Sequence, residues 1–338
     1  WVQHYYRCTV PGLETLRWRS TDEQPPAALL IQSPYDVDAR YSQKRETQWV
    51  GYKVHLSETC DVGQPDVITQ VSTTLATTSD FVMAPVIQED LAARDLVPGT
   101  HLVDSGYVVA DVLVSAQTHH QIDVVGPPLS SSSRQSRDGQ GYDLHTFVIN
   151  WDAQEAQCPQ GHHSVKWTPG QSQTGESVIR IRFDRATCRV CPTRSVCTTS
   201  PEAPRQLTVK PQALHEALQA ARQRQETPEF KAQYALRAGV ESTLSQAVRR
   251  FDLRRSRYIG LARTHLQQLV NATAMNVVRV IAWLRGASGN ERRRKPGHFA
   301  RLAPHPLSPQ GVLCAGVTYT QQSLMWPSPV GIMSRTAQ

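Results

Sequence analysis

The sequence predicts a mixed α/β sheet flanked by helices, with a small β-rich insertion before a helical C-terminal part. In residues 49–56 and 66–73 apolar side chains alternate with polar ones on either side of a turn at 60–64, which is typical of two strands with one buried face. Helical and extended apolar segments then alternate along residues 80–126. Strands that alternate with helices form a sheet covered by helices, so an α/β domain is expected.

The elements of the first half follow from local signals. Residues 1–32 are polar and rich in turns, and we interpret them as the remnant of an upstream segment. Asp80 is placed to cap a helix that ends near residue 93. The apolar runs 101–104 and 122–126 predict strands on either side of a helix at 108–118. Residues 33–129 are therefore expected to form the first part of the core.

The second half divides by composition. The low apolar content of residues 130–141 predicts a loop, and residues 142–210 predict a β-rich insertion. Helical periodicity over 211–285 predicts the completion of the domain, with the last helix, 261–284, packed in the core. Residues 286–338 predict a poorly ordered basic tail, because their composition changes to Gly, Ser, Pro and charge. Within the helical part a stripe toward the sheet is formed by Val240, Leu244, Val248 and Phe251.

Positive charge is concentrated in one part of the chain. The net charge is +7, but residues 205–301 contain 19 Lys or Arg against 6 Asp or Glu. This asymmetry favours a polyanionic partner, because neutralised phosphates release counterions. Arginines interleaved with aromatic residues also suit contact with a nucleic-acid backbone, although a solvated helical face is the plain alternative. The candidate DNA-binding residues are Arg249, Arg250, Arg254, Arg255 and Arg257.

Two acidic residues lie where carboxylates can converge. Asp104 closes an apolar strand, and Glu241 lies beside the apolar stripe of a predicted helix. Carboxylates on a strand end and a packed helix can share divalent metal ions that activate a nucleophile for phosphoryl transfer. Magnesium requires such hard oxygen ligands. Taken singly, an Asp after a strand is usually a turn residue and a Glu on a helix is usually solvated, so the pair carries the hypothesis.

The segments around these acids resemble those of the insertion-sequence transposases of the DDE type, whose catalytic domain is RNase H-like. In many members the third acid lies in a Tyr-(2)-Arg-(3)-Glu-(6)-Lys signature, and the second ends a strand in Asp-x-Gly-Tyr. The Lys of the signature falls on Val248 here, although Arg249 follows. The matching residues are Tyr234, Arg237 and Glu241 for the first pattern and Asp104, Gly106 and Tyr107 for the second.

The resemblance implies a transposase that needs three acids and Mg²⁺ or Mn²⁺, with Asp104 and Glu241 as catalytic metal ligands. The first acid would lie on the opening strand of the sheet, and no apolar strand ending in Asp precedes residue 33. We therefore expect an N-terminally truncated remnant that lacks its first strand and first acid and is competent at best for DNA binding.

Three other functions stand as alternatives. The chain could be a DNA-binding module without chemistry, or a working nuclease in which Asp36 or Asp38 replaces the missing acid. A metabolic α/β enzyme is disfavoured, because the sequence has neither a Gly-rich phosphate loop nor a nucleophile elbow.

Four of the seven cysteines have spacing typical of a structural zinc site, as in a zinc ribbon. His162 or His163 could replace one thiolate, and free, partly buried thiols are the alternative. Related transposases often carry a similar insertion between the second and third acids. Cys8, Cys60 and Cys314 are expected to be unpaired. The candidate zinc ligands are Cys158, Cys188, Cys191 and Cys197.

The expected surroundings of the chain follow from the same features. No apolar run approaches the roughly 20 residues that span a bilayer, and the first residues show no signal-peptide pattern, so a bacterial cytoplasmic location is expected, at the nucleoid when DNA is bound. The resemblance implies inverted-repeat element ends and target DNA as partners, no membrane, and a possible homodimer that joins two DNA ends.

Overall fold

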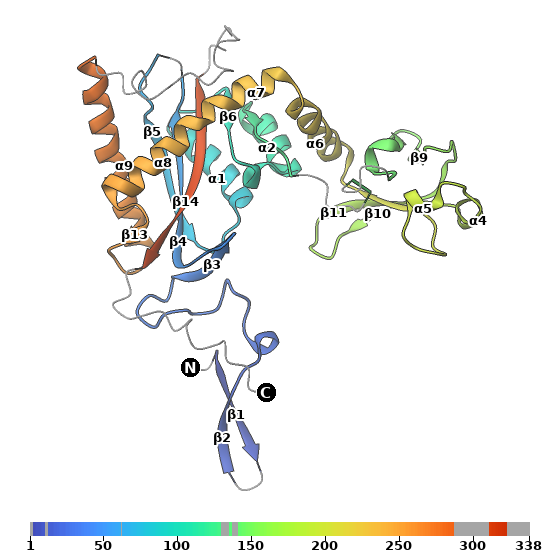
Figure 1. Ribbon diagram of the computed structural model, residues 1–338, viewed down its shortest axis with the longest axis horizontal. Coiled ribbons are helices and arrows are strands. Elements are labelled where there is room, and N and C mark those ends of the chain that lie inside the picture. The colour runs from blue at the N-terminus through green and yellow to red at the C-terminus, as the bar shows by residue number, and fades with distance from the viewer. Residues whose placement is uncertain are drawn as a thin grey trace.

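The computed structural model describes residues 3–10, 13–61, 63–129, 135–136, 141–286 and 311–322. The predicted mixed α/β sheet flanked by helices is confirmed (Figure 1). Within these residues no helix combines the length and apolar character that crossing a membrane requires.

The central sheet is built around one long strand, β4 (Thr47–Thr59). Its first part pairs with β3 (Arg40–Lys44), and its second part pairs on the same edge with β5 (Ile68–Leu75), both antiparallel. On its other edge the strand order continues through β14, β6 and β7. The bounds of these strands are Val312–Gln322, Thr100–Leu102 and Asp123–Val125.

The strand β14 comes from a region that sequence patterns assigned to a poorly ordered tail, and for residues 312–322 that prediction is wrong. β14 pairs antiparallel with β4 and parallel with β6, and its end pairs with the short strand β13 (Arg255–Ser256). Cys314 on β14 also forms a disulfide with Cys60, which was expected to be unpaired. A segment distant in sequence thus fills the centre of the sheet.

Helices cover both faces of the sheet (Figure 1). On one face α1 (Asp80–Ala92) and α2 (Ala110–His120) bury Ile87, Leu91 and Ala116 against Leu313 and other sheet residues. On the other face α8 (Ala238–Phe251) and α9 (Leu261–Leu284) lie over β4 and β5, with Ala247 and Met275 buried. Burial of these side chains supplies most of the stabilisation, at roughly 25 cal/mol per Å² of apolar surface.

The β-rich insertion has a small core of its own. Its strands are β8 (Val148–Asn150), β9 (Glu155–Gln157), β10 (Ser164–Gln171), β11 (Ser177–Phe183) and β12 (Gln206–Val209), with short helices α4 (Arg185–Arg189) and α5 (Arg194–Cys197). Phe147, Ile181 and Leu207 are buried together. The following helix, α6 (Gln212–Gln225), is fixed to the sheet by Arg224, which donates two hydrogen bonds to the Asp123 carboxylate at 2.7 and 2.8 Å.

The first residues are more structured than the turn-rich composition suggested. Strands β1 (Tyr5–Val10) and β2 (Leu13–Trp18) form an antiparallel hairpin, followed by a short 3₁₀ turn, Thr21–Glu23. Figure 1 shows this hairpin beyond the end of the main sheet. The sequence reading missed it because neighbouring prolines outweighed the short alternation of side chains.

A buried ion pair joins the sheet to both covering helices. The fully buried Glu58 of β4 accepts hydrogen bonds from Thr243 of α8 at 2.6 Å and from Arg279 of α9 at 2.9 Å. Arg279 also donates to the backbone carbonyl of Asp66 at 2.9 Å. Burial raises the pKa of the Glu58 carboxyl, while Arg279 and Thr243 act in the opposite direction. The carboxylate therefore depends on these partners to stay charged.

We predict that Arg279→Leu lowers the free energy of unfolding by about 3–5 kcal/mol, because it leaves a buried carboxylate without its counter-charge. The double variant Glu58→Leu/Arg279→Leu should recover most of this loss. The difference between Arg279→Leu and wild type should shrink as pH falls, since a protonated Glu58 needs no cation. Urea unfolding at several pH values measures all three, and a loss below about 1 kcal/mol in the single variant would contradict the assignment.

A second prediction concerns His101 on β6, which is fully buried and has no hydrogen-bond partner on either ring nitrogen. Burial lowers the pKa of its imidazole to about 4 from 6.5. Between pH 6.5 and 4, His101 is therefore protonated in the unfolded chain and neutral in the folded chain. Up to about 3 kcal/mol of stability is lost as pH falls through this range. His101→Leu should reduce this acid loss, whereas His119→Leu on the surface of α2 should keep it. Equal pH profiles for wild type and His101→Leu would show the prediction to be wrong.

Candidate functional site

Asp104 follows β6 directly and caps the short 3₁₀ turn Ser105–Tyr107. Its carboxylate accepts a hydrogen bond from the Ser105 amide at 2.8 Å, and its side chain is 36% exposed. A Cβ at Gly106 would lie 2.9 Å from a carboxylate oxygen of Asp80, so a larger residue here would displace that side chain. The turn thus holds Asp104 at the carboxyl end of a buried strand and leaves its carboxylate open to solvent.

Tyr107 anchors this turn from inside the protein. Its ring is buried, and its hydroxyl lies 2.5 Å from Nδ1 of the buried His55 on β4. Burial raises the pKa of the Tyr107 phenol well above its usual value and lowers the pKa of His55 to about 4, so both groups are neutral near pH 7. The Tyr of the Asp-x-Gly-Tyr pattern therefore serves as a neutral hydrogen-bonded support for Asp104.

Glu241 lies in the first turn of α8, where its side chain is 72% exposed. The helix is held against the sheet by the buried residues Val240 and Ala247 and by the partly buried Leu244, so the predicted apolar stripe has the expected neighbours. This packing leaves Glu241 at the boundary between core and solvent. The carboxylate is accessible from outside while its backbone is fixed.

Arg237 connects the two acids. Its guanidinium lies 3.8 Å from Asp104 and 3.4 Å from Glu241, measured between nitrogen and carboxylate oxygen, and its side chain is only 10% exposed. Its Nε donates to the carbonyl of Ala315 on β14 at 3.3 Å. Strand, helix and β14 thus converge on one buried cation.

Tyr234 completes this arrangement. It belongs to α7 (Pro228–Tyr234), which is capped by Thr227, whose hydroxyl accepts from the Phe230 amide at 3.2 Å. The Tyr234 ring stacks on Phe230 with 5.4 Å between centroids, and the Arg237 guanidinium lies 5.8 Å from the Tyr234 centroid. Burial raises the pKa of the Tyr234 phenol. The structure therefore brings Asp104, Tyr234, Arg237 and Glu241 together.

The two acids do not form a metal site in this arrangement. Both face one guanidinium, which neutralises part of their charge, and a metal ion would compete with that cation. In the parts of the chain that the structure describes, no group of three or more His, Cys, Asp or Glu side chains could hold a metal ion. The residues present therefore do not fit a pair of divalent ions, which requires several converging carboxylates.

Asp36 and Asp38, considered as substitutes for the missing acid, serve another purpose. Asp36 is buried and accepts hydrogen bonds from the Tyr52 hydroxyl at 2.7 Å and from the Gly260 amide at 3.1 Å. Asp38 accepts from the Leu261 amide at 3.1 Å. The two carboxylates satisfy backbone donors at the start of α9, where negative charge is favoured by the helix dipole. Sequence reasoning missed this role because the partners lie more than 200 residues away.

The predicted DNA-binding arginines form a separate exposed surface at the other end of α8. Arg249 and Arg250 lie in the last turn of the helix, about 12 Å along its axis from Glu241. Arg254 covers the Tyr319 ring at 4.5 Å from its centroid. Arg257 pairs with Asp252 at 2.9 Å, and Arg255 begins β13. We call Arg249, Arg250, Arg254, Arg255 and Arg257 the basic surface.

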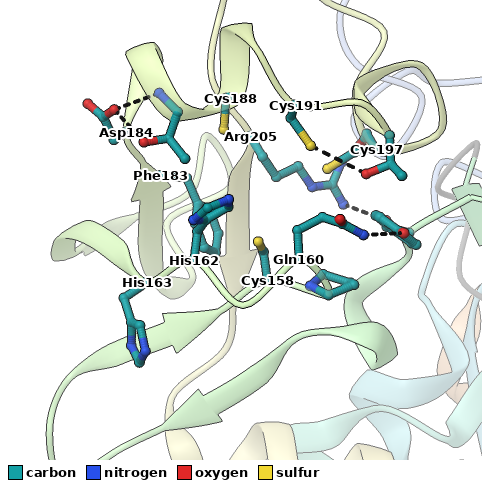
Figure 2. A pocket seen from close by; sticks show the side chains of 14 residues that line it. Cys158, Gln160, His162, His163, Phe183, Asp184, Cys188, Cys191, Cys197 and Arg205 are labelled. Atoms are coloured by element: carbon teal, nitrogen blue, oxygen red, sulfur yellow. Dashed lines mark hydrogen bonds between the residues drawn. The ribbon is translucent and has the colours of Figure 1, made fainter.

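The four candidate zinc ligands line one pocket of the insertion (Figure 2). Cys158 lies on one side of the pocket, and Cys188, Cys191 and Cys197 come from the opposite side. Cys158 sits in a tight turn closed by Gly161, whose amide donates to the Cys158 carbonyl at 2.8 Å and whose φ is +82°. All four thiols are free and partly buried. Burial raises the pKa of the Cys197 thiol, and the neighbouring cysteines add to this.

The two neighbouring histidines, His162 and His163, also line the pocket, but the His163 ring is turned away from the four sulfurs (Figure 2). Its Nδ1 lies 3.2 Å from a carboxylate oxygen of Glu155. The Arg205 side chain lines the same pocket and donates to the carbonyls of Cys197 at 3.0 Å and Tyr142 at 3.3 Å. The cysteines therefore share a pocket whose polar lining also includes a cation.

Comparison with known proteins gives a family match. Residues 157–281 match the family model described as a transposase DDE domain. This segment includes the cysteine pocket, Tyr234, Arg237, Glu241 and the basic surface, and Asp104 precedes it. Neither the curated proteins nor the solved structures provide a match. The match covers 125 of the 338 residues, and it confirms the resemblance to DDE transposases drawn from the sequence.

Proposed function

We propose that this chain is the catalytic-domain part of an insertion-sequence transposase that binds DNA and does not cut it. The family acts on DNA by cleavage and strand transfer and usually uses divalent metal ions. The observation that carries the proposal is the pairing of Asp104 and Glu241 with Arg237 in place of a third carboxylate.

The order of the central strands supports an RNase H-like sheet. In β5–β4–β14–β6–β7, β4 is antiparallel to both of its neighbours, whereas β14, β6 and β7 are parallel to one another. In such a sheet the central strand corresponds to the opening strand of the family, which would bring the first acid beside the second. Here the strand in that position is β14, taken from residues 312–322.

The residues of β14 offer no replacement for the first acid, since the strand contains neither Asp nor Glu. In the parallel pairing of β14 with β6, Cys314 lies opposite Leu102. Two residues further along both segments, the same register places Gly316 opposite Asp104. A Cβ at Gly316 would lie only 3.1 Å from side-chain carbons of Leu244 and Val240 on α8. A side chain at this position would require Leu244 and Val240 to shift by a few tenths of an ångström, and this tight packing supports a site without the third acid.

Nicking of supercoiled plasmid tests the proposed loss of chemistry. We expect no Mg²⁺- or Mn²⁺-dependent nicking by the chain above the level of its Glu241→Gln variant, since loss of one acid from a DDE site removes the charge that holds the metals. Asp104→Asn serves as a second matched variant. Metal-dependent nicking that both substitutions abolish would overturn the proposal, because a third acid would then have to be present.

We propose that the basic surface binds DNA. The alternative function, a DNA-binding module without catalytic activity, would use the same surface. Removing Arg249, Arg250 and Arg254 together should weaken binding to every duplex tested and reduce the slope of log K against log salt by up to about 0.9 per lost phosphate contact. Fluorescence anisotropy over a salt series measures both quantities.

The matched control removes the same charge from exposed arginines of the N-terminal part, Arg7, Arg17 and Arg45. These changes lower the net charge equally but leave the basic surface intact. Equal losses of affinity in the two triple variants would mean that net charge, rather than this surface, drives binding.

We also propose that the four cysteines hold a structural zinc ion. Their spacing and common pocket support this, although the four sulfurs do not form a ligand group as the described residues stand and would have to converge beside the Arg205 side chain. We expect about one zinc per purified chain, lost in Cys188→Ser/Cys191→Ser and kept in Cys8→Ser, with a lower melting temperature only where zinc is lost. Elemental analysis with thermal unfolding measures this, and a zinc-free wild-type chain prepared without chelators would refute it.

A further inference from the structure

Helix α9 directs its polar side chains toward the protein. Gln267 and Gln268 are buried and donate to the backbone carbonyls of Arg255 and Leu253, at 2.8 and 3.4 Å. Asn276 is hydrogen-bonded to both the amide and the carbonyl of Ile68 at 2.8 Å. A surface helix normally turns its apolar residues to the core and its polar residues to water. On α9 much of this pattern is reversed.

The opposite face of α9 is apolar and exposed. Leu266 is 61% exposed, Val270 60% and Leu284 69%. Arg279 is the one Lys, Arg, Asp or Glu between residues 264 and 284, and it points inward to Glu58. In Figure 1 the helix lies at the outer edge of the domain. We call this face the outer stripe; its members are Leu266, Leu269, Val270, Val277, Ile281 and Leu284.

A continuous apolar face of this kind requires a partner. Large exposed apolar patches on folded proteins mark interaction sites, since burial removes their apolar surface from water. The outer stripe runs from Leu266 to Leu284, or about 27 Å along the helix axis. It has no charge with which to hold a phosphate backbone, so it is not a continuation of the basic surface.

We propose that the outer stripe packs against the same stripe of a second copy of this chain, forming a homodimer through paired α9 helices. An uncharged apolar face is complementary to itself, as a two-fold interface requires. Val270, Val277 and Leu284 recur every seven residues, and a second set seven residues apart includes Leu266, Thr273 and Val280. Two such sets, offset by three or four residues, are the pattern of helices packed at about 20° with interlocking side chains.

This interface goes beyond the proposed function and does not depend on it. The outer stripe contains neither the acids nor the arginines of the basic surface. An absence of nicking or of DNA binding would therefore leave the proposed interface untouched. If the chain does bind DNA, a dimer with two basic surfaces would hold two duplexes. The proposal therefore supplies the surface for the homodimer that the resemblance implied.

Analytical ultracentrifugation of the full chain without DNA tests the proposal. Wild type is expected to shift from monomer to dimer between nanomolar and high micromolar concentration. Val270→Glu/Val277→Glu should raise the dimer dissociation constant at least about tenfold, since each glutamate would be buried without a counter-charge. The control Val148→Glu/Val190→Glu places the same charges at exposed positions of the insertion and should leave the constant unchanged.

Two outcomes would overturn the interface. One is a wild-type chain that stays monomeric at every concentration. Protection of the outer stripe from hydroxyl radicals in such a monomer would show that other residues of the same chain cover it. The other is a dimer that the α9 variant leaves intact. Circular dichroism and the melting temperature establish that the variants fold, and if the glutamates disturb folding, Val270→Ser/Val277→Ser provides the same test with smaller polar side chains.

Discussion

The structure depends on the backbone hydrogen bonds that β14 makes with both of its neighbours. Without this strand, the long strand β4 and the short strand β6 would each present an unpaired row of amides and carbonyls in the middle of the domain, which costs about as much as the hydrogen bonds themselves. β14 pairs with β4 along most of its length and with β6 at its start. Its side chains also enter the apolar clusters on both faces, through Leu313 and Ala315 on one and Val312 and Cys314 on the other.

The candidate site inherits its geometry from the same strand. Arg237 reaches both acids because its guanidinium is anchored to the Ala315 carbonyl, and α8 lies close to β14 because Gly316 has no side chain. The disulfide between Cys60 and Cys314 joins β14 to the end of β4. Strand β14, which pairs with both β4 and β6, thus also fixes how Asp104 and Glu241 are held. A larger side chain at Gly316 would press on Leu244 and Val240 of α8.

Local sequence patterns predicted elements whose signals are contained within a few residues. The alternation in 49–56 corresponds to β4, and the helix expected near Asp80 begins there, although Ser79 rather than Asp80 occupies the cap position. The residues Tyr234, Arg237 and Glu241, singled out by their spacing, lie together beside Asp104. The role of β14 could not be predicted in this way, because β4 and β6, its neighbours in the centre of the sheet, lie more than 200 residues away. The same holds for Asp36 with Gly260 and for Glu58 with Arg279.

Helix α9 shows a different limit of pattern reading. Its many Leu, Val and Ala residues predicted core packing, but composition does not say which face of a helix is buried. Hydrogen bonds from Gln267, Gln268 and Asn276 to backbone groups determine the face that meets the protein, because these backbone groups need partners. The apolar residues of the outer stripe are then left exposed, whereas Ala272 and Met275 remain buried.

The two ends of α8 carry residues proposed for two different functions, catalysis at the first turn and DNA binding at the last turn. Glu241 at the first turn acts only as part of a set of acids, whereas each arginine of the basic surface contributes to phosphate contact on its own. Under the proposed function, loss of one acid would remove chemistry completely, while each arginine lost would lower the DNA affinity by a further factor. On the same proposal the domain binds DNA without cutting it, and a dimer formed through α9 would add a second binding surface without requiring any catalytic residue.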